Sequence, residues 1–138
     1  MADRSFDEFL VTTRPKAAAA FVCGDPGPVT AISTRHDPAT FFGPGGGHVS
    51  GAKTVIDTNE SSATMFRSGG ETHLEVLHSS HDGALAYWVG LQHATVHISG
   101  RDEPVPMTLR ITELFRHDEN GWQLIHRHAD QHAEPDRG

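Results

Sequence analysis

The chain has 138 residues and a formal net charge of −7 with histidine neutral, and 36% of its residues are hydrophobic. This length suits one domain with a substantial core, and the acidic balance argues against nucleic acid and anionic membranes as partners. No run approaches the roughly 18 apolar residues that a membrane-spanning helix needs. Cys23 is the single cysteine, and the acidic N-terminus lacks a signal-peptide pattern, so we expect a cytoplasmic protein.

Apolar residues at helical spacing begin the chain and predict an N-terminal helical region. They are Phe6, Phe9, Leu10, Ala17, Ala20 and Phe21. Pro15 interrupts the pattern, so either one helix kinks there or a second helix begins with Thr13 as its cap. A short helix is expected at about residues 28–33, and residues 39–51 predict two short strands around a glycine-rich turn.

The following segment predicts a longer helix over about residues 51–68, capped by Ser50 and ended by Gly69-Gly70. Three long strands are expected after it, because apolar and polar residues alternate over about 71–81, 84–98 and the C-terminal hairpin. Helices followed by a run of antiparallel strands indicate an α+β fold.

The hairpin of residues 109–130 is the most informative stretch, because its polar residues can be placed. A three-residue loop, Glu119 to Gly121, would set Asp118 opposite Trp122 and Glu113 opposite Arg127. The same register sets Phe115 opposite Ile125 and Ile111 opposite Ala129. It leaves another face with the pairs Arg110–Asp130, Thr112–His128 and Leu114–His126. A carboxylate and a guanidinium are therefore expected on an otherwise apolar face.

Several motifs resemble the nuclear transport factor 2-like superfamily, and most closely its SnoaL-like and ketosteroid-isomerase-like small proteins. They are Ala39-Thr40-Phe41-Phe42-Gly43-Pro44-Gly45-Gly46, Gly51, Leu85-Ala86-Tyr87-Trp88-Val89-Gly90, Leu109-Arg110-Ile111-Thr112, Gly121-Trp122 and His126-Arg127-His128-Ala129-Asp130. The resemblance implies a cone, in which a strongly curved, mostly antiparallel sheet wraps around N-terminal helices and leaves a pocket. It also implies a homodimer through the sheet. One SnoaL-like domain would span residues 1–138, with a disordered tail over about 131–138.

Strand parity gives the candidate ligand site. Leu85, Tyr87 and Val89 would share a concave apolar face with Leu109, Ile111, Phe115 and Ile125. Tyr87, Glu113 and Arg127 would supply polar contacts there, since convergent polar groups in an apolar pocket fix a small ligand. Phe42, Trp88 and His93 are further candidates, with Trp88 at the pocket wall or the dimer face. A cross-strand structural pair is the alternative for Glu113 and Arg127.

Other polar residues have structural explanations. His126 and His128 share a strand face and could reach a metal ion with a third ligand, but packing at a dimer face or core rim explains them as well. His36-Asp37 suggests proton transfer, although adjacent extended residues point apart and Asp37-Pro38 favours a turn. We therefore expect neither a metal nor a cofactor.

The preferred hypothesis is a dimeric protein that binds a small hydrophobic or carbonyl-containing ligand in a mostly apolar pocket. The first alternative is an isomerase- or cyclase-like enzyme with Glu113 as the catalytic general base and Arg127 or a histidine stabilising the oxyanion. Ketosteroid isomerase chemistry itself is disfavoured, because Tyr87 is the single tyrosine. The second alternative is a non-catalytic association module.

Overall fold

A computed structural model describes residues 2–133. The tail expected at about 131–138 lies outside the described residues from residue 134 onward. The helices are α1 (Ala2–Val11), α2 (Thr13–Phe21), α3 (Gly27–Ala31) and α4 (Ala52–Ala63). The strands are β1 (Thr40–Phe42), β2 (Val49–Ser50), β3 (Phe66–Asp82), β4 (Leu85–Ile98), β5 (Val105–Asp118) and β6 (Gly121–Gln131).

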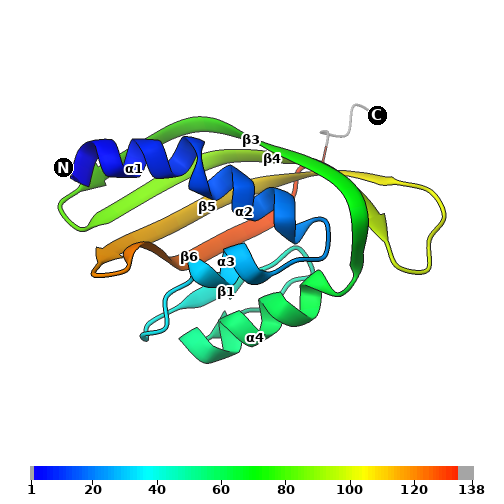
Figure 1. Cartoon of the computed structure of the whole chain (residues 1–138), viewed down its shortest axis with the longest axis horizontal. Helices are drawn as coiled ribbons and strands as arrows, with labels where there is room; N and C mark the ends of the chain where they lie inside the picture. The colour runs from blue at the N-terminus through cyan, green and yellow to red at the C-terminus, as the bar shows by residue number, and fades with distance from the viewer. Residues whose placement is uncertain (1, 134–138) are drawn as a thin grey trace.

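The described strands form one curled, unclosed sheet in the order β2-β1-β6-β5-β4-β3. Neighbouring strands are antiparallel except for β1 and β6, which run parallel. The helices lie along one face of this sheet, with α1 and α2 crossing the long strands and α4 beside the short ones (Figure 1). The α+β class and the curved sheet with N-terminal helices are therefore confirmed.

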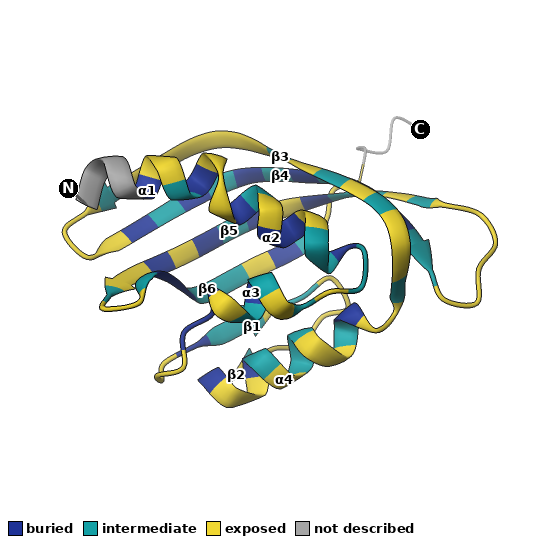
Figure 2. Ribbon diagram, in the orientation of Figure 1, coloured by how far each residue is buried: buried dark blue, intermediate teal, exposed yellow. Residues whose placement is uncertain are grey.

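The core lies between α1 and the inner face of β4, β5 and β6, and buried positions alternate along β4 and β5 (Figure 2). Phe6 of α1 is fully buried, and its ring lies 5.6 Å from that of Phe115 and 5.1 Å from that of Trp122. This aromatic contact attaches the first helix to the C-terminal hairpin. No described helix is long and apolar enough to cross a membrane.

The region after α4 differs from the expectation. The helix ends at Ala63 rather than near residue 68, and Gly69 and Gly70 lie within β3. Gly69 has a φ of 97° beside a register shift between Arg67 and Glu71. A Cβ on Gly70 would lie 2.9 Å from the carbonyl oxygen of Val22. The two glycines thus serve a β-bulge and a close backbone contact, which a sequence pattern does not separate from a helix end.

The C-terminal hairpin has the expected pairs from Arg110 to Leu114, but its turn and the pairs next to the turn differ. Asp118 pairs with Gly121, so the loop has two residues rather than three, and the expected pairing of Asp118 with Trp122 is wrong. Phe115 pairs with Leu124 instead of Ile125. A register shift between Leu114 and Phe115 compensates for the shorter loop, so that Glu113 does pair with Arg127. This register shift is a β-bulge, whose one extra residue restores the expected pairing on the far side of it.

Candidate functional site

Glu113 is the centre of the buried polar cluster. Its carboxylate accepts hydrogen bonds at Oε1 from Arg14 Nε (2.8 Å) and Trp88 Nε1 (2.7 Å). At Oε2 it accepts from Arg14 Nη2 (2.8 Å) and Arg127 Nη1 (2.5 Å). Glu113 is fully buried, and Arg14 is only 3% exposed. The predicted pairing of Glu113 with Arg127 is confirmed, and a second arginine joins it.

The electrostatics of the cluster hold Glu113 ionised. Burial raises the pKa of the Glu113 carboxyl, but Arg14 and Arg127 outweigh it and bring this pKa down to about 2. Two guanidinium groups and an indole N–H occupy both carboxylate oxygens. A carboxylate with so low a pKa and with its lone pairs engaged is a weak base near neutral pH.

Arg14 is the site residue that the sequence interpretation missed. It follows Leu10 by four residues and precedes Ala17 by three, so it lies on the buried stripe of α1 and α2. An arginine on an apolar helical stripe was the available signal, because a buried charge needs a partner. Pro15 falls in the first turn of α2, where the missing N–H costs nothing, and lets the helix start just before Arg14.

Gln92 extends the cluster along β4. Its Oε1 accepts a hydrogen bond from Arg127 Nη2 at 3.0 Å, and its Nε2 donates to Thr72 Oγ1 at 3.1 Å. Arg127 is thereby fixed on two sides, by Glu113 and by Gln92. These two contacts hold the guanidinium of Arg127 in one orientation.

A cavity of about 50 Å³ adjoins these groups. Four apolar residues line it: Ala18, Phe21, Val29 and Leu124. Four polar residues complete the lining: Arg14, Asn59, Gln92 and Arg127. A second cavity of about 10 Å³ shares Asn59, Leu124 and Arg127 with it. The interior of the cone therefore offers room for a few non-hydrogen atoms next to two arginines.

The predicted concave face of β4 is wrong by one residue. Ala86 and Trp88 are buried on the inner face, whereas Leu85 is 53% exposed. Tyr87 pairs with Leu114 on the outer face, and its hydroxyl lies 3.1 Å from His78 Nδ1. Tyr87 therefore does not reach the cavity. Trp88 lies at the inner wall and binds Glu113.

The other candidates also lie on the outer face. The ring of Phe42 lies 4.9 Å from that of His126 and 5.5 Å from that of His128. His126 Nδ1 lies 2.7 Å from Thr40 Oγ1. Burial and the neighbouring His128 lower the pKa of His126. Within residues 2–133, no group of three potential ligands is placed to hold a metal ion.

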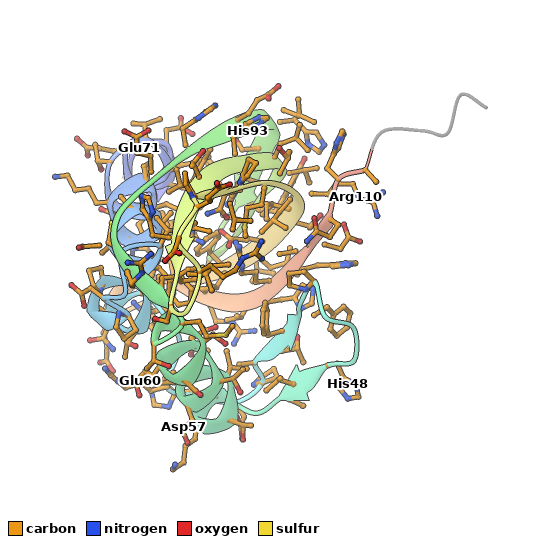
Figure 3. All side chains as sticks on the ribbon, turned by 90° about the vertical axis from the view of Figure 1, so that its right-hand side faces the viewer. His48, Asp57, Glu60, Glu71, His93 and Arg110 are labelled. Carbon is orange, nitrogen blue, oxygen red and sulfur yellow. The ribbon has the colours of Figure 1, made fainter. Side chains whose placement is uncertain are left out.

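His93 stacks on His73 at 4.6 Å, and its Nε2 lies 2.8 Å from Glu75 Oε1. His93 does not line the cavity, and Figure 3 labels it among the strands, apart from the helices. Neither His36 nor Asp37 lines the cavity. Asp37 Oδ1 accepts a hydrogen bond from the backbone N–H of Ala52 at 2.7 Å, at the start of α4.

Solved structures share this architecture at low sequence identity. A nuclear transport factor 2-like superfamily protein from Salmonella enterica serovar Typhimurium is 16% identical, with a TM-score of 0.80 over 98% of this chain and 96% of that one. An NTF2-like protein from Streptomyces avermitilis, provisionally assigned as a dehydratase, is 19% identical, with a TM-score of 0.79 over 97% and 100%. A ketosteroid isomerase-like protein from Erwinia carotovora atroseptica is 19% identical, with a TM-score of 0.67 over 93% and 99%.

Comparison of the sequence with curated proteins gives no significant match. The sequence model of the SnoaL-like domain family matches residues 16–132 of this chain. The matched range includes Glu113, Arg127, Trp88 and Gln92. The fold neighbours belong to the NTF2-like and ketosteroid isomerase-like superfamily. The chain belongs to the SnoaL-like domain family and shares the fold of the NTF2-like structures.

Proposed function

We propose that this SnoaL-like protein binds a small molecule in the interior cavity beside Arg14, Gln92 and Arg127. The observation that carries the proposal is that one buried carboxylate, Glu113, holds two guanidinium groups at the edge of a cavity. Buried polar groups that converge on a partly apolar cavity are the usual means of orienting a ligand.

Glu113 serves in this proposal as the residue that positions the two arginines. Its pKa of about 2 and its four hydrogen bonds from Arg14, Trp88 and Arg127 favour this role over that of a general base. The proposal therefore favours a binding protein over an isomerase- or cyclase-like enzyme that uses Glu113.

The indole N–H of Trp88 is a reporter for the cavity. It donates to Glu113, so a ligand that contacts the arginines changes its environment. We expect members of a library of small neutral and charged compounds to shift the Trp88 indole resonance in ¹H–¹⁵N spectra. The Trp122→Phe variant assigns the two indole signals. Protein taken directly from the producing cells is also denatured and its small-molecule extract analysed by mass spectrometry.

A matched pair of α4 variants locates the binding. Asn59→Leu fills the cavity and is expected to abolish the response, whereas Ser61→Leu, at an exposed position of the same helix, preserves it. The proposal is contradicted if no compound shifts the Trp88 signal and no ligand is extracted. It is equally contradicted if the shifts persist in Asn59→Leu.

We also propose that two copies of the chain associate through the outer face of the sheet. Leu77, Leu114 and Phe42 are 61%, 40% and 38% exposed on this face. A shallow groove of about 460 Å³ connects Leu77 with Val89, Leu91 and His128. Exposed apolar side chains gathered on one face favour an association surface.

Sedimentation equilibrium tests the association. The protein is expected to sediment as a dimer, and Leu114→Glu is expected to shift it to the monomer, because a charge would be buried in the interface. Val11→Glu is the control, since Val11 is 72% exposed on α1, away from the outer face of the sheet. A monomeric wild-type protein, or equal effects of the two variants, would reject the interface.

A further inference from the structure

The charges around the cavity do not balance. Arg14 and Arg127 carry a positive charge at any physiological pH, and Glu113 supplies one negative charge. The other described residues that line the cavity, Ala18, Phe21, Val29, Asn59, Gln92 and Leu124, are neutral. The buried cluster thus carries one uncompensated positive charge. Such a charge is costly in a protein interior unless a counter-ion is present.

The hydrogen bonds show where the counter-ion would lie. Arg14 uses Nε and Nη2 for Glu113, and Arg127 uses Nη1 for Glu113 and Nη2 for Gln92. Arg14 Nη1 is buried and has no hydrogen-bond partner among the described residues. Nearly all buried N–H groups in proteins are paired, so a buried guanidinium nitrogen without an acceptor indicates a missing acceptor.

The acceptor groups next to Arg14 are already used, and Asn59, the remaining polar residue of the lining, makes no hydrogen bond to Arg14 Nη1. Both oxygens of Glu113 already accept two hydrogen bonds each. Gln92 is also fixed, because its oxygen accepts from Arg127 and its nitrogen donates to Thr72. An acceptor that enters the cavity from outside, a water molecule or a ligand, would complete the hydrogen bonds of Arg14.

We infer that the cavity binds a small organic anion, a short-chain monocarboxylate, whose oxygen accepts a hydrogen bond from Arg14 Nη1. This inference deepens the proposed function and depends on it. One negative charge neutralises the cluster, and hydrogen bonds between guanidinium and carboxylate are the strong, charge-assisted kind. The cavity of about 50 Å³ limits the ligand to a few non-hydrogen atoms. Ala18, Val29 and Leu124 suit a short alkyl chain.

Matched pairs of carboxylates and amides test the inference on the whole wild-type protein. Acetate and propionate are titrated against acetamide and propionamide at pH 7 and constant ionic strength, with the Trp88 indole resonance as the readout. The pairs have nearly the same size and shape and differ in charge. We expect each carboxylate to bind at least tenfold more tightly than its amide, and chloride at the same concentration to leave the resonance unchanged.

The Arg14→Lys variant tests whether Arg14 is the residue that prefers a carboxylate. Lysine keeps the charge but lacks the planar fork, so the preference for carboxylate over amide is expected to fall several-fold. Circular dichroism first establishes that the variant is folded. If it is not folded, the wild-type comparison of acid and amide decides alone.

The outcomes separate this inference from the proposed function. If neutral compounds bind to the wild type but not to Asn59→Leu, the cavity is a ligand site. If carboxylates then bind no more tightly than their amides, the anion inference is wrong. If carboxylates bind equally well to Asn59→Leu, they bind elsewhere and the inference is wrong. If neither class of compound shifts Trp88, both statements fail.

Discussion

Arg14 and Glu113 lie 99 residues apart in the sequence and form a two-pronged ion pair, with Nε to Oε1 and Nη2 to Oε2 both at 2.8 Å. The pair connects the first turn of α2 to the middle of β5. Glu113 also holds Arg127 of β6. One carboxylate thus connects a helix near the N-terminus with both strands of the C-terminal hairpin.

Replacing Glu113 with Gln is expected to lower the free energy of unfolding by about 3–5 kcal/mol, because the change leaves two buried guanidinium groups without a counter-charge. Urea denaturation at pH 7 measures the loss as a lower midpoint. Glu119→Gln, at an exposed turn position, is the control and should change the midpoint little. A Glu113→Gln protein as stable as the control would show that the cluster contributes nothing to folding.

The lowered pKa of the Glu113 carboxyl makes part of the folding stability sensitive to acid. Its folded-state pKa is lowered from 4.5 to about 2, so the unfolded chain binds the proton more readily. The stabilisation is therefore complete above about pH 5 and is lost as the pH falls from 4.5 towards 2. Unfolding free energies measured between pH 2 and 6 should fall more steeply for the wild type than for Glu113→Gln. Parallel curves would contradict the lowered pKa.

Gly90→Ala is expected to destabilise the protein by about 1–3 kcal/mol or more. A Cβ at position 90 would lie 2.0 Å from the carbonyl oxygen of Glu75 and 3.1 Å from the ring of Trp88, so the strand or the indole must move. Gly45→Ala, where a Cβ meets nothing within 4 Å, is the matched control. Thermal unfolding compares the two variants. If Gly90→Ala unfolds at the same temperature as the Gly45→Ala control, β3 and β4 do not approach this closely at Gly90.

His126 is expected to titrate below the ordinary histidine value of about 6.5, because burial and protonated His128 disfavour its charged form. Nuclear magnetic resonance of the ring protons measures the pKa directly. Since the unfolded chain takes up this proton more readily, stability should decline as the pH falls below about 6.5. His128→Asn should raise the pKa of His126, and the remote His36→Asn should not. An unchanged pKa in both variants would contradict the coupling.

Asp37→Ala is expected to cost about 0.5–2 kcal/mol, because its carboxylate accepts the hydrogen bond of the Ala52 N–H at the start of α4. Asp57→Ala removes only an exposed ion pair with Lys53 on the same helix and should change the stability little. Chemical denaturation of the two variants measures the difference. Equal losses would show that Asp37 does not stabilise the start of this helix.

Sequence periodicity was enough to predict the fold class, the long strands and the pairing of Glu113 with Arg127. It did not predict which face of β4 is buried, because Ala86 and Gly90 are small and carry little hydrophobic signal, whereas Leu85, Tyr87 and Val89 carry more. The inner face of β4 has little room for larger side chains beside Trp88. A strand assigned by apolarity alone was therefore placed one residue out of phase.

The sequence predicted the contact of Glu113 with Arg127 but not that of Arg14 with Glu113, because only the first depends on local pairing. Glu113 and Arg127 are neighbours across a hairpin, so local register determines their contact. Arg14 reaches Glu113 only through the packing of α2 on the sheet, which no local pattern encodes. The bulge beside Leu114 was equally hidden, because it compensates for the shorter turn at Glu119 and Asn120.

The distance between Arg14 and Glu113 along the chain also has a consequence during protein synthesis. At about 5–20 residues per second, a ribosome adds Glu113 about 5–20 seconds after Arg14. Throughout that interval α2 carries Arg14 on its apolar stripe without its partner Glu113. The helix can therefore dock in its final position only when translation of the domain is nearly complete.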